Sequence, residues 1–299
     1  MQRTFIPGSE WLYFKIYCGT KTADKILTES ILPLIEDNDI FNSFFFIRYA
    51  DPKNHFRIRF KTKNANEVGF IMSAMQVTLQ PYIDNQLIWK VQLDTYNREI
   101  ERYGEETMEL TEQLFQIDSL FTLQFLNMIE GEEGEIIRWH YALSAIDKLL
   151  NAFNFSIQDK STLLKSLSEG FGIEFGMDKN LKIQLDKKYR DNTKSIQEFI
   201  AQNREKNEEY EPIFDLLNAY EEAIRAISNQ IIKKNNTANS EKTINDLLGS
   251  YIHMLCNRLF KSKQRMHELV IYDFLYRYYK SEIARNKSLK TQLKTFKNV

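Results

Sequence analysis

Short apolar runs alternate with longer amphipathic stretches over the first hundred residues of the chain. Apolar residues recur at helical spacing in residues 23–36 and 66–82, a period that buries one face of a helix. β-Branched and aromatic residues predict four strands, at residues 11–18, 43–49, 56–61 and 87–98. The resulting order, strand, helix, strand, strand, helix, strand, predicts a ferredoxin-like βαββαβ sheet.

From residue 105 onward the pattern is helical, with amphipathic runs that include residues 109–129 and 244–260. Only 10 Gly and 5 Pro are present, which argues against a large all-β protein because tight turns need these residues. The sequence therefore predicts the α+β class. We divide it into a sheet portion, residues 1–104, and a mostly helical portion, residues 105–299, packed together as one unit.

The composition excludes several classes of protein. With 40 Lys and Arg against 41 Asp and Glu, the net charge of −1 argues against a direct nucleic-acid binder with a dominant basic face. The sequence shows neither a signal peptide nor an apolar run of about 18 residues that would span a membrane. Cys18 and Cys256 fit neither a disulfide framework nor zinc spacing. These features predict a cytoplasmic protein with no metal centre.

Three arginines on two neighbouring predicted strands form the first candidate site. Arg57 and Arg59 are two residues apart in a strand, so their side chains share one face while Ile58 points into the core. Adjacent guanidinium groups repel each other, and an anionic ligand or paired carboxylates would relieve that repulsion. Arg48 on the preceding strand can add a third guanidinium. The alternative is a solvated sheet face with local salt bridges.

A second candidate lies in residues 96–104, YNREIERYG. Glu99 and Arg102 are three residues apart and can meet on one helical turn. Gly104 indicates a turn of the chain. The simpler interpretation of the Glu99 and Arg102 pair is an ordinary surface ion pair.

A third candidate lies in residues 250–260, SYIHMLCNRLF, which predict a helix. His253 and Asn257 share one face of that helix, as do Met254 and Arg258. Histidine is an acid or base with a pKa near neutrality, which suits proton transfer. The alternative is a histidine whose hydrogen bonds are satisfied in the core or at an interface.

Four segments, in this order, resemble one known family: WLYFKIYCGTKTADKILTESILPL, FFFIRYADPKNHFRIRF, DTYNREIERYG and SYIHMLCNRLF. They are similar to the elimination domain of class I lanthipeptide dehydratases, also called the thiopeptide-type bacteriocin biosynthesis domain. The resemblance extends from about residue 11 to residue 279. The sequence contains no GxSxG, P-loop, GxGxxG, HExxH or CxxC motif that would indicate another chemistry.

The resemblance implies a two-step reaction on a ribosomally made precursor peptide with a leader. In this family a partner domain uses glutamyl-tRNA to esterify Ser or Thr with glutamate. The elimination domain then expels glutamate and leaves dehydroalanine or dehydrobutyrine. The family's longer glutamylation domain has no match in this sequence, so the resemblance implies a split elimination protein that depends on a separate glutamylating enzyme. No metal or organic cofactor is implied.

The family's motifs, matched residue by residue, imply five catalytic residues: Arg57, Arg59, Glu99, Arg102 and His253. The three arginines would hold the glutamyl group and the developing charge. His253 would transfer the proton, and Glu99 would orient Arg102. Four further residues are expected to bind substrate: Arg48, Tyr103, Asn257 and Arg258.

The sequence departs from the family's pattern at two loops. Gly104 is followed by Glu105 and Glu106, where the family often has a second glycine, and this adds negative charge near Arg102. Lys261 stands where glycine is more typical. Both departures change the expected loop geometry, and neither removes a candidate catalytic residue.

Two other functions stay open at this point. Thiopeptide pathways contain related stand-alone enzymes that join two dehydroalanines in a formal [4+2] cycloaddition and expel the leader peptide, but these need not keep the Arg and His set. A non-catalytic scaffold could instead bind the leader peptide as an added strand at a sheet edge. The aromatic content of 13% is also compatible with a homodimer, although no surface for it can be chosen.

Overall fold

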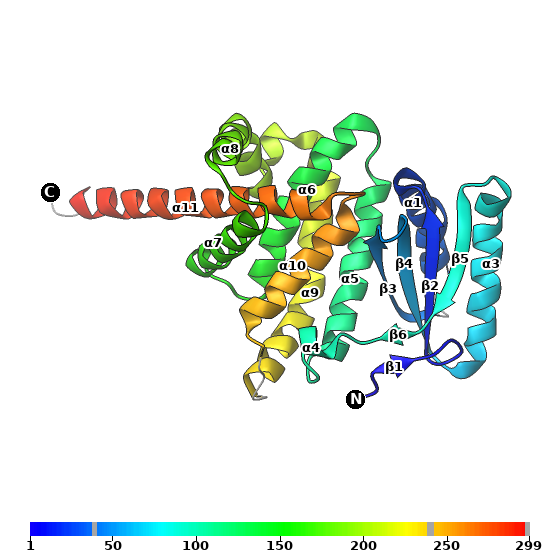
Figure 1. Cartoon of the computed structure of the whole chain (residues 1–299). Coiled ribbons are helices and arrows are strands. Elements are labelled where there is room, and N and C mark those ends of the chain that lie inside the picture. The colour runs from blue at the N-terminus through cyan, green and yellow to red at the C-terminus, as the bar shows by residue number, and fades with distance from the viewer. Residues whose placement is uncertain (38–40, 238–241, 297–299) are drawn as a thin grey trace. The chain divides into compact units, whose positions relative to one another are not determined.

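The computed structural model of the chain describes residues 1–37, 41–237 and 242–296. It has the predicted α+β class, with a sheet in the N-terminal part and helices through the rest of the chain (Figure 1). None of the described helices combines the length and the hydropathy that a membrane crossing requires.

The chain divides into two compact units. The first contains residues 1–138 and 222–264, and the second contains residues 139–221 and 265–299. The first unit therefore combines the sheet with helices from both sides of residue 104, and all nine candidate site residues belong to it.

A four-stranded antiparallel sheet in the order β3-β4-β2-β5 forms the centre of the first unit. Its strands are β2 (Trp11–Cys18), β3 (Phe41–Tyr49), β4 (His55–Thr62) and β5 (Ile88–Asp94). The four strands predicted from the sequence are thus present, but the fourth stops at Asp94. The chain then forms β6 (Tyr96–Asn97), which pairs with β1 (Thr4–Phe5) in a separate two-stranded sheet.

Helices follow the first and third strands of this sheet, as predicted. β2 leads into α1 (Thr20–Ile26), a π-helical turn η1 (Leu27–Ile31) and α2 (Leu32–Glu36). β4 leads through a 3₁₀ turn η2 (Ala65–Glu67) into α3 (Val68–Asp84). Their apolar faces cover one face of the sheet, where alternate strand residues are completely buried: Ile16, Phe46, Phe56, Ile58 and Phe60. This core hides one strand face, so the arginines of β4 lie on the other.

Three helices bring the remaining candidate residues to the sheet: α4 (Ile100–Tyr103), α5 (Met108–Asn127) and α10 (Ile244–Leu259). α5 and α10 pack along β3. A second, aromatic core joins them to the sheet, because Phe115 of α5 lies 5.6 Å from Phe45 of β3 and 6.2 Å from Tyr251 of α10 between ring centroids. Cys18 and Cys256 are both buried, and no disulfide joins them.

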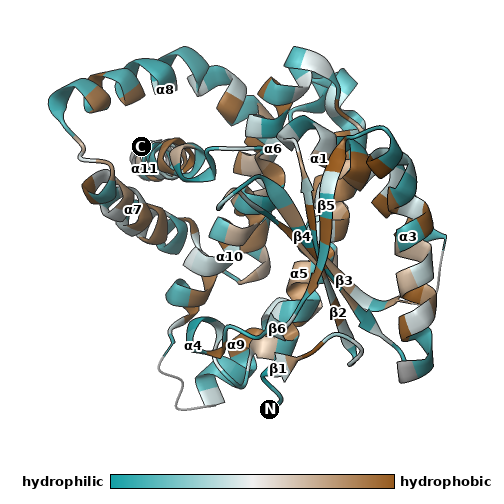
Figure 2. Cartoon of the chain, turned by 45° about the vertical axis from the view of Figure 1, so that its right-hand side comes forward, coloured by the Kyte–Doolittle hydropathy of each residue, from teal (hydrophilic) through white to brown (hydrophobic). Residues whose placement is uncertain are grey.

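The second unit is helical. Its own helices are α7 (Ile157–Glu174) and α8 (Lys179–Ile200), followed by the 3₁₀ turns η3 (Arg204–Lys206) and η4 (Glu208–Tyr210). Residues of α6 (Gly131–Ala152), α9 (Glu211–Thr237) and α11 (Gln264–Phe296) complete it. α8 has no counterpart in the sequence prediction, because it is largely polar (Figure 2) and buries only a few residues: Leu185, Ile196 and Phe199.

Candidate functional site

Arg59 is a buried cation enclosed by aromatic rings. It lies on the face of β4 opposite the apolar core, is 8% exposed, and its Cζ is 4.4 Å from the ring centroid of Tyr13. Two more rings, Tyr96 and Phe45, lie 4.9 and 5.0 Å away. Cation–π contacts of this kind hold a guanidinium without neutralising it. The Nε and Nη1 atoms are buried and form no hydrogen bond, which is unusual because buried donors are nearly always paired.

Arg57 shares the face of Arg59 but lies in different surroundings. Its Cζ is 3.6 Å from the ring centroid of Tyr49, and its Nε donates a hydrogen bond of 3.0 Å to Nε2 of His55. Among the residues that the structure describes, neither Arg57 nor Arg59 forms an ion pair with a carboxylate. The structure thus gives no support to local salt bridges as the partners of these two arginines.

His55 holds Arg57 as a neutral hydrogen-bond acceptor. Its Nδ1 lies 2.8 Å from the carbonyl oxygen of Lys53, and a carbonyl can only accept, so Nδ1 carries the proton and Nε2 is left to accept from Arg57. Burial lowers the pKa of His55 below its ordinary value, and the nearby charge of Arg57 lowers it further. No pattern in the sequence marks His55 or Tyr49 as a site residue. The register places them opposite each other at the ends of β4 and β3.

A small hollow beside Arg59 brings together residues from three of the sequence motifs. It measures about 20 Å³ and is lined by Phe45, Ile47, Arg59, Tyr96, Asn97, Glu99, Tyr103, Met108, Phe115 and Met254. Arg59, Glu99 and Tyr103 are predicted site residues, and Met254 follows the predicted His253. The volume is about that of one water molecule. A substrate group would therefore lie across the opening unless the rings around it move.

Glu99 and Arg102 form the expected pair at the rim of this hollow. Their charged atoms are 3.6 Å apart, and the side chains are 62% and 37% exposed, respectively. Nε of Arg102 also donates to Oγ of Ser250 at 3.2 Å, which ties α4 to α10. Gly104 ends α4 with a φ of +76°, a conformation that glycine adopts without strain. The predicted turn at Gly104 is therefore confirmed.

Tyr103 is a buried ring in the wall of the hollow. It stacks on Tyr251 with ring centroids 6.0 Å apart and an interplanar angle of 3°. Burial raises the pKa of Tyr103 well above its ordinary value, so its hydroxyl stays protonated at neutral pH. Tyr103 can therefore donate a hydrogen bond but supplies no negative charge.

His253 is placed by two anchors on the same face of α10. The helix begins after a capping box in which Thr243 and Asp246 exchange hydrogen bonds. Ser250, His253 and Asn257 follow at positions i, i+3 and i+7, which lie on one helix face. Ser250 contacts Arg102, while Asn257 contacts β3. His253 is half-buried between them, one residue before Met254 of the hollow.

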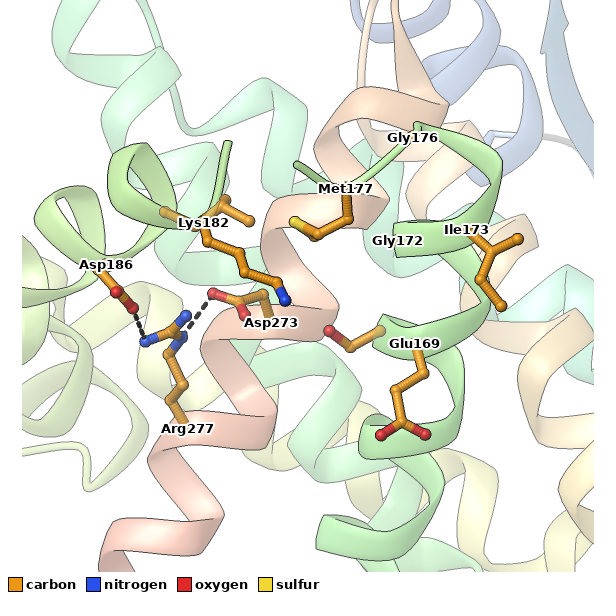
Figure 3. Close-up of a pocket in the computed structure, with 11 residues that line it drawn as sticks. Glu169, Gly172, Ile173, Gly176, Met177, Lys182, Asp186, Asp273 and Arg277 are labelled. Carbon is orange, nitrogen blue, oxygen red and sulfur yellow. Dashed lines mark hydrogen bonds and ion pairs between the residues drawn. The ribbon is translucent and has the colours of Figure 1, made fainter. Parts of the chain in front are cut away.

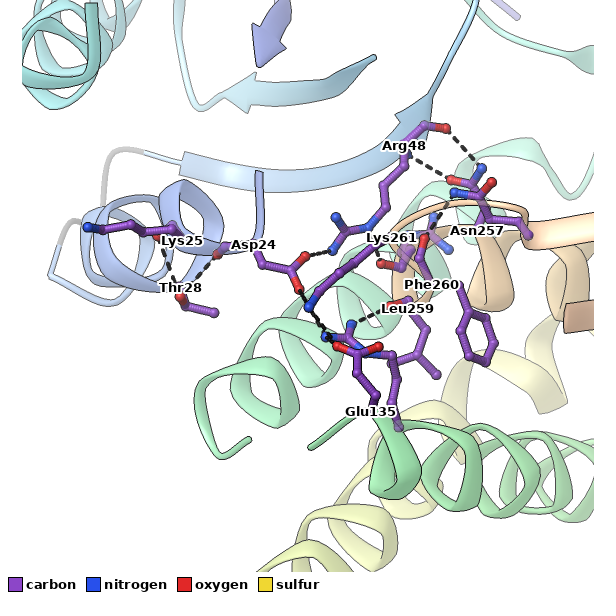
Figure 4. Close-up of polar contacts among 12 residues, drawn as sticks. Asp24, Lys25, Thr28, Arg48, Glu135, Asn257, Leu259, Phe260 and Lys261 are labelled. Atoms are coloured by element: carbon purple, nitrogen blue, oxygen red, sulfur yellow. Dashed lines mark hydrogen bonds and ion pairs between the residues drawn. The ribbon is translucent and has the colours of Figure 1, made fainter. Parts of the chain in front are cut away.

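Arg48 and Asn257 (Figure 4) form a supporting network with Arg258. The Asn257 amide accepts from the backbone N–H of Arg48 at 2.8 Å and donates to its carbonyl at 2.9 Å. Nε of Arg48 donates to the Arg258 carbonyl at 2.7 Å, and Nη2 lies 2.6 Å from Asp24. Arg258 is fully buried against Asp118 at 3.4 Å. None of the three lines the hollow with Arg59, and Arg258 contacts its wall from behind, with Cζ 4.6 Å from the ring centroid of Phe115.

A much larger cavity of about 780 Å³ lies in the second unit among α7, α8 and α11 (Figure 3). It contains none of the nine predicted residues. Arg277 neutralises two carboxylates of this cavity, because it donates to Asp273 at 2.7 Å and also pairs with Asp186. Burial raises the pKa of Asp273. If size were the criterion, this cavity would be the candidate functional site. We choose the hollow beside Arg59 instead, because it contains a buried charge without a carboxylate partner.

The candidate site is therefore an arginine-rich face of the sheet, with an acidic residue and a histidine supplied by neighbouring helices. The described residues include no cluster of three or more His, Cys, Asp or Glu side chains that could hold a metal ion. Ser250 was missed by the sequence analysis, and its place three residues before His253 was the available signal. Its partner, Arg102, is far away in sequence.

A family model described as "Lantibiotic biosynthesis dehydratase C-term" matches residues 11–279. The chain belongs to this family. Among curated relatives, it is 26% identical over 276 residues to the subtilin biosynthesis protein SpaB of Bacillus subtilis, covering 90% of this chain and 25% of SpaB. The chain thus spans about a quarter of the length of that relative.

Two solved structures share the fold. The tRNA-dependent lantibiotic dehydratase MibB from Microbispora sp. 107891 matches with a TM-score of 0.70 and 21% identity, over 93% of this chain and 29% of MibB. The pyridine synthase TbtD from thiomuracin biosynthesis matches with a TM-score of 0.53 and 12% identity, over 91% of this chain and 99% of TbtD. At these identities the likeness concerns the fold, which is common to two different reactions.

Proposed function

We propose that this chain eliminates glutamate from glutamylated Ser or Thr residues of a ribosomally made precursor peptide, leaving dehydroalanine or dehydrobutyrine. Membership of the lantibiotic dehydratase family supports the substrate class. A separate glutamyl-tRNA-dependent enzyme would supply the glutamylated peptide, and the description of MibB as tRNA-dependent is consistent with that supply.

The observation that carries the proposal is the unpartnered charge of Arg59 and Arg57. Neither is neutralised by a carboxylate within the described part of the chain, and two donors of Arg59 are buried without a hydrogen bond. A glutamyl group carries a carboxylate, and guanidinium groups bind carboxylates with paired, charge-assisted hydrogen bonds. An anionic substrate would satisfy the donors that the protein leaves open.

The reaction needs a base, a charge stabiliser and a site for the leaving group. In our proposal His253 takes the α-proton of the glutamylated residue. The Cα–Cβ double bond forms as the Cβ–O bond to the glutamyl ester breaks, and glutamate leaves with the electron pair as a carboxylate. Arg59 and Arg102 stabilise the developing negative charge, and Glu99 orients Arg102 through their ion pair.

The test is to mix the purified protein with a peptide that carries a glutamyl ester on Ser or Thr, and to follow both free glutamate and peptide mass. We expect stoichiometric glutamate release with formation of the dehydrated peptide. Arg59→Met, Arg102→Ala and His253→Ala should each lower the rate by about 100-fold or more, a typical loss for charge stabilisation or proton transfer.

Lys25→Ala is a suitable control, because Lys25 is an exposed residue of α1 in the same unit, and its ion pair with the exposed Glu29 spans 3.7 Å. It should leave the elimination rate unchanged. Absence of glutamate release by the wild-type protein contradicts the proposed reaction. Unchanged elimination in both Arg102→Ala and His253→Ala contradicts the assigned site.

The [4+2] cycloaddition is the alternative reaction, because this chain shares its fold with the pyridine synthase TbtD. The same measurement of peptide mass tests it. An already dehydrated peptide is offered in place of the glutamylated one. Ring formation with loss of the leader would favour cycloaddition, whereas our proposal expects no turnover of that peptide. Binding of precursor without any chemical change would favour a scaffold.

We also propose that the sheet is a ferredoxin-like unit. The strand order β3-β4-β2-β5 supports this assignment, as do the helices that follow β2 and β4. In this arrangement the two helices cover one sheet face, which leaves the arginine face available for a peptide substrate.

A further inference from the structure

The two edges of the four-stranded sheet differ in whether other parts of the chain pair with their backbone groups. At the β3 edge, Oγ of Ser119 accepts a hydrogen bond from the Phe46 N–H at 3.2 Å, and Asn257 pairs with both backbone groups of Arg48. At the other edge, β5 pairs with β2 and with no other strand that the structure describes. Figure 1 draws β5 on the side of the sheet away from α5. An unpaired edge strand is a template for another strand.

The bare edge is also apolar. Leu87, Trp89 and Val91 are 39%, 52% and 36% exposed, and Lys90 and Asp94 are the two charged residues of β5. Natural proteins usually protect such an edge with several charges, a proline or a covering element. β5 therefore has the properties of an interaction surface rather than of a protected edge.

The side chains of β5 follow an order in which the strand is complementary to a second, antiparallel copy of itself. Residues 90–94 read Lys, Val, Gln, Leu, Asp: a cation, an apolar residue, an amide, an apolar residue and an anion. Val91 and Leu93 stand opposite the core residues Ile16 and Phe14 of β2, so they share the core face. Lys90, Gln92 and Asp94 consequently lie on the arginine face of the sheet, where Asp94 also pairs with Lys15 of β2 in the same chain.

We propose that β5 is the interface of a homodimer, in which two copies of the chain pair their β5 strands antiparallel about a two-fold axis through Gln92. In this register Lys90 of each copy stands opposite Asp94 of the other. Val91 stands opposite Leu93, and the two Gln92 residues face each other. Every pair is complementary. The Lys90–Asp94 and Val91–Leu93 pairs each occur twice because the interface is isologous, and the Gln92 pair on the axis occurs once.

Other registers are less favourable. Centring the axis on Lys90 would place two ammonium groups opposite each other, and centring it on Val91 would place Lys90 opposite Gln92 and Asp94 opposite Ile88. Like charges directly opposite one another destabilise a sheet, whereas opposite charges stabilise it. The charge order of β5 therefore selects the register about Gln92 and favours a second copy over an unrelated strand.

The helix that flanks this edge supports the same arrangement. α3 has no charged residue from Val68 to Ile83, although Phe70, Val77 and Ile83 are exposed. Antiparallel pairing of two β5 strands brings the two copies of α3 to the same side of a continuous sheet. An uncharged helix brings no repulsion to that approach, and depletion of charge is typical of the centre of an interface.

Charge reversal tests the register. Lys90→Glu places a new carboxylate opposite Asp94 of the other copy, and Asp94→Lys places a new ammonium group opposite Lys90. Sedimentation velocity and light scattering on the full chain should show a dimer for the wild type and, for either variant, about tenfold to hundredfold weaker dimerisation. Ile183→Lys is the matched control, because Ile183 is 53% exposed on α8 of the second unit. It should leave the dimer unchanged.

Mixing the two variants gives a sharper result. Lys90→Glu in one copy and Asp94→Lys in the other restore opposite charges at both ends of the pairing, so the mixture should form heterodimers although each variant alone does not. This rescue also shows that both variants are folded. A monomeric wild type at all concentrations overturns the proposal. So does a dimer that neither variant weakens.

Cross-linking locates the axis. Gln92→Cys places two thiols directly opposite each other, within reach of a short bismaleimide, whereas Lys90→Cys places them four residues apart along the seam. Cys18 and Cys256 are buried and give little background. We expect efficient dimer capture for Gln92→Cys and weak capture for Lys90→Cys. Equal capture, or capture of Lys90→Cys alone, contradicts the register.

Discussion

Asn257 on α10 uses both ends of its side-chain amide to pair with the backbone N–H and carbonyl of Arg48, 209 positions earlier in the chain. The amide occupies the place that a further strand would take beside β3. It fixes α10 along the sheet and thereby sets the position of His253, one helical turn away. A residue expected to bind substrate thus has contacts that support the site.

Asn257→Ala removes both of these hydrogen bonds and leaves two backbone groups of Arg48 unpaired. We expect a loss of about 1–3 kcal/mol in the free energy of unfolding, since unsatisfied buried groups cost more than the bond itself. Urea denaturation measures this. Asn192→Ala is the control, because the side chain of the half-buried Asn192 donates to the Lys188 carbonyl one turn earlier in the same helix. Equal small losses in both variants would show that Asn257 does not act as a clamp between α10 and the backbone of Arg48.

Glu112 neutralises Arg98 inside the first unit. Its carboxylate accepts from Nε and Nη2 of Arg98 and from the Tyr96 hydroxyl, each at 2.7 Å. Glu112→Ala leaves a buried guanidinium without this partner, which should cost about 3–5 kcal/mol of stability. Glu109→Ala should cost less than about 1 kcal/mol, because Glu109 is exposed and 3.7 Å from the same arginine. Thermal and urea unfolding of both variants give the comparison.

Arg59→Met is expected to separate stability from activity. The change keeps the contacts with the rings of Tyr13, Phe45 and Tyr96 but removes a buried charge that has no carboxylate partner. Replacing such a charge with an apolar side chain is neutral or stabilising, so the melting temperature should stay the same or rise while glutamate release is lost. A destabilised variant with full activity would give Arg59 a structural role instead.

His55 makes the free energy of unfolding depend on pH, and the direction of this dependence can be predicted. Burial holds the pKa of His55 in the folded state below the ordinary value of 6.5, so the unfolded chain binds a proton more readily. Stability is therefore fully present above about pH 6.5 and decreases as the pH falls from there towards the lower folded-state pKa. Below the folded-state pKa this term is constant.

The measurement is the free energy of unfolding of the wild type and of His55→Gln at about pH 8 and about pH 5.5. Glutamine can accept from Arg57 but does not titrate in this range. The wild type should therefore lose more stability than His55→Gln over the same interval. Equal losses in the two proteins would show that His55 does not contribute.

The strands were predictable because each has a local pattern. β2 spans the predicted residues 11–18, and the alternation in β4 correctly placed Ile58 in the core. The predicted strand at residues 87–98 is divided at Thr95, because Tyr96 pairs with Phe5 of β1, a partner that no local pattern shows. α8 was missed for a different reason, since most of its residues are polar and its three buried residues are too few to stand out in the sequence.

The site could be predicted only in part. Strand geometry placed Arg57 and Arg59 on one face, and helix geometry paired Glu99 with Arg102. The sequence does not show that Arg57 lies against Tyr49 and His55 while Arg59 lies among other rings, because these partners come from different strands. The supporting role of Arg258 likewise depends on Asp118 of another helix.

The clamp between Asn257 and Arg48 also orders events during synthesis. The 209 positions that separate the two residues take the ribosome roughly 10–40 s at usual elongation rates. Throughout that interval the edge of β3 has Ser119 of α5 beside Phe46 but lacks Asn257 beside Arg48, while residues 139–221 of the second unit emerge. Premature chain termination before α10 would therefore leave the backbone of β3 unpaired at Arg48, and the arginine face without its histidine.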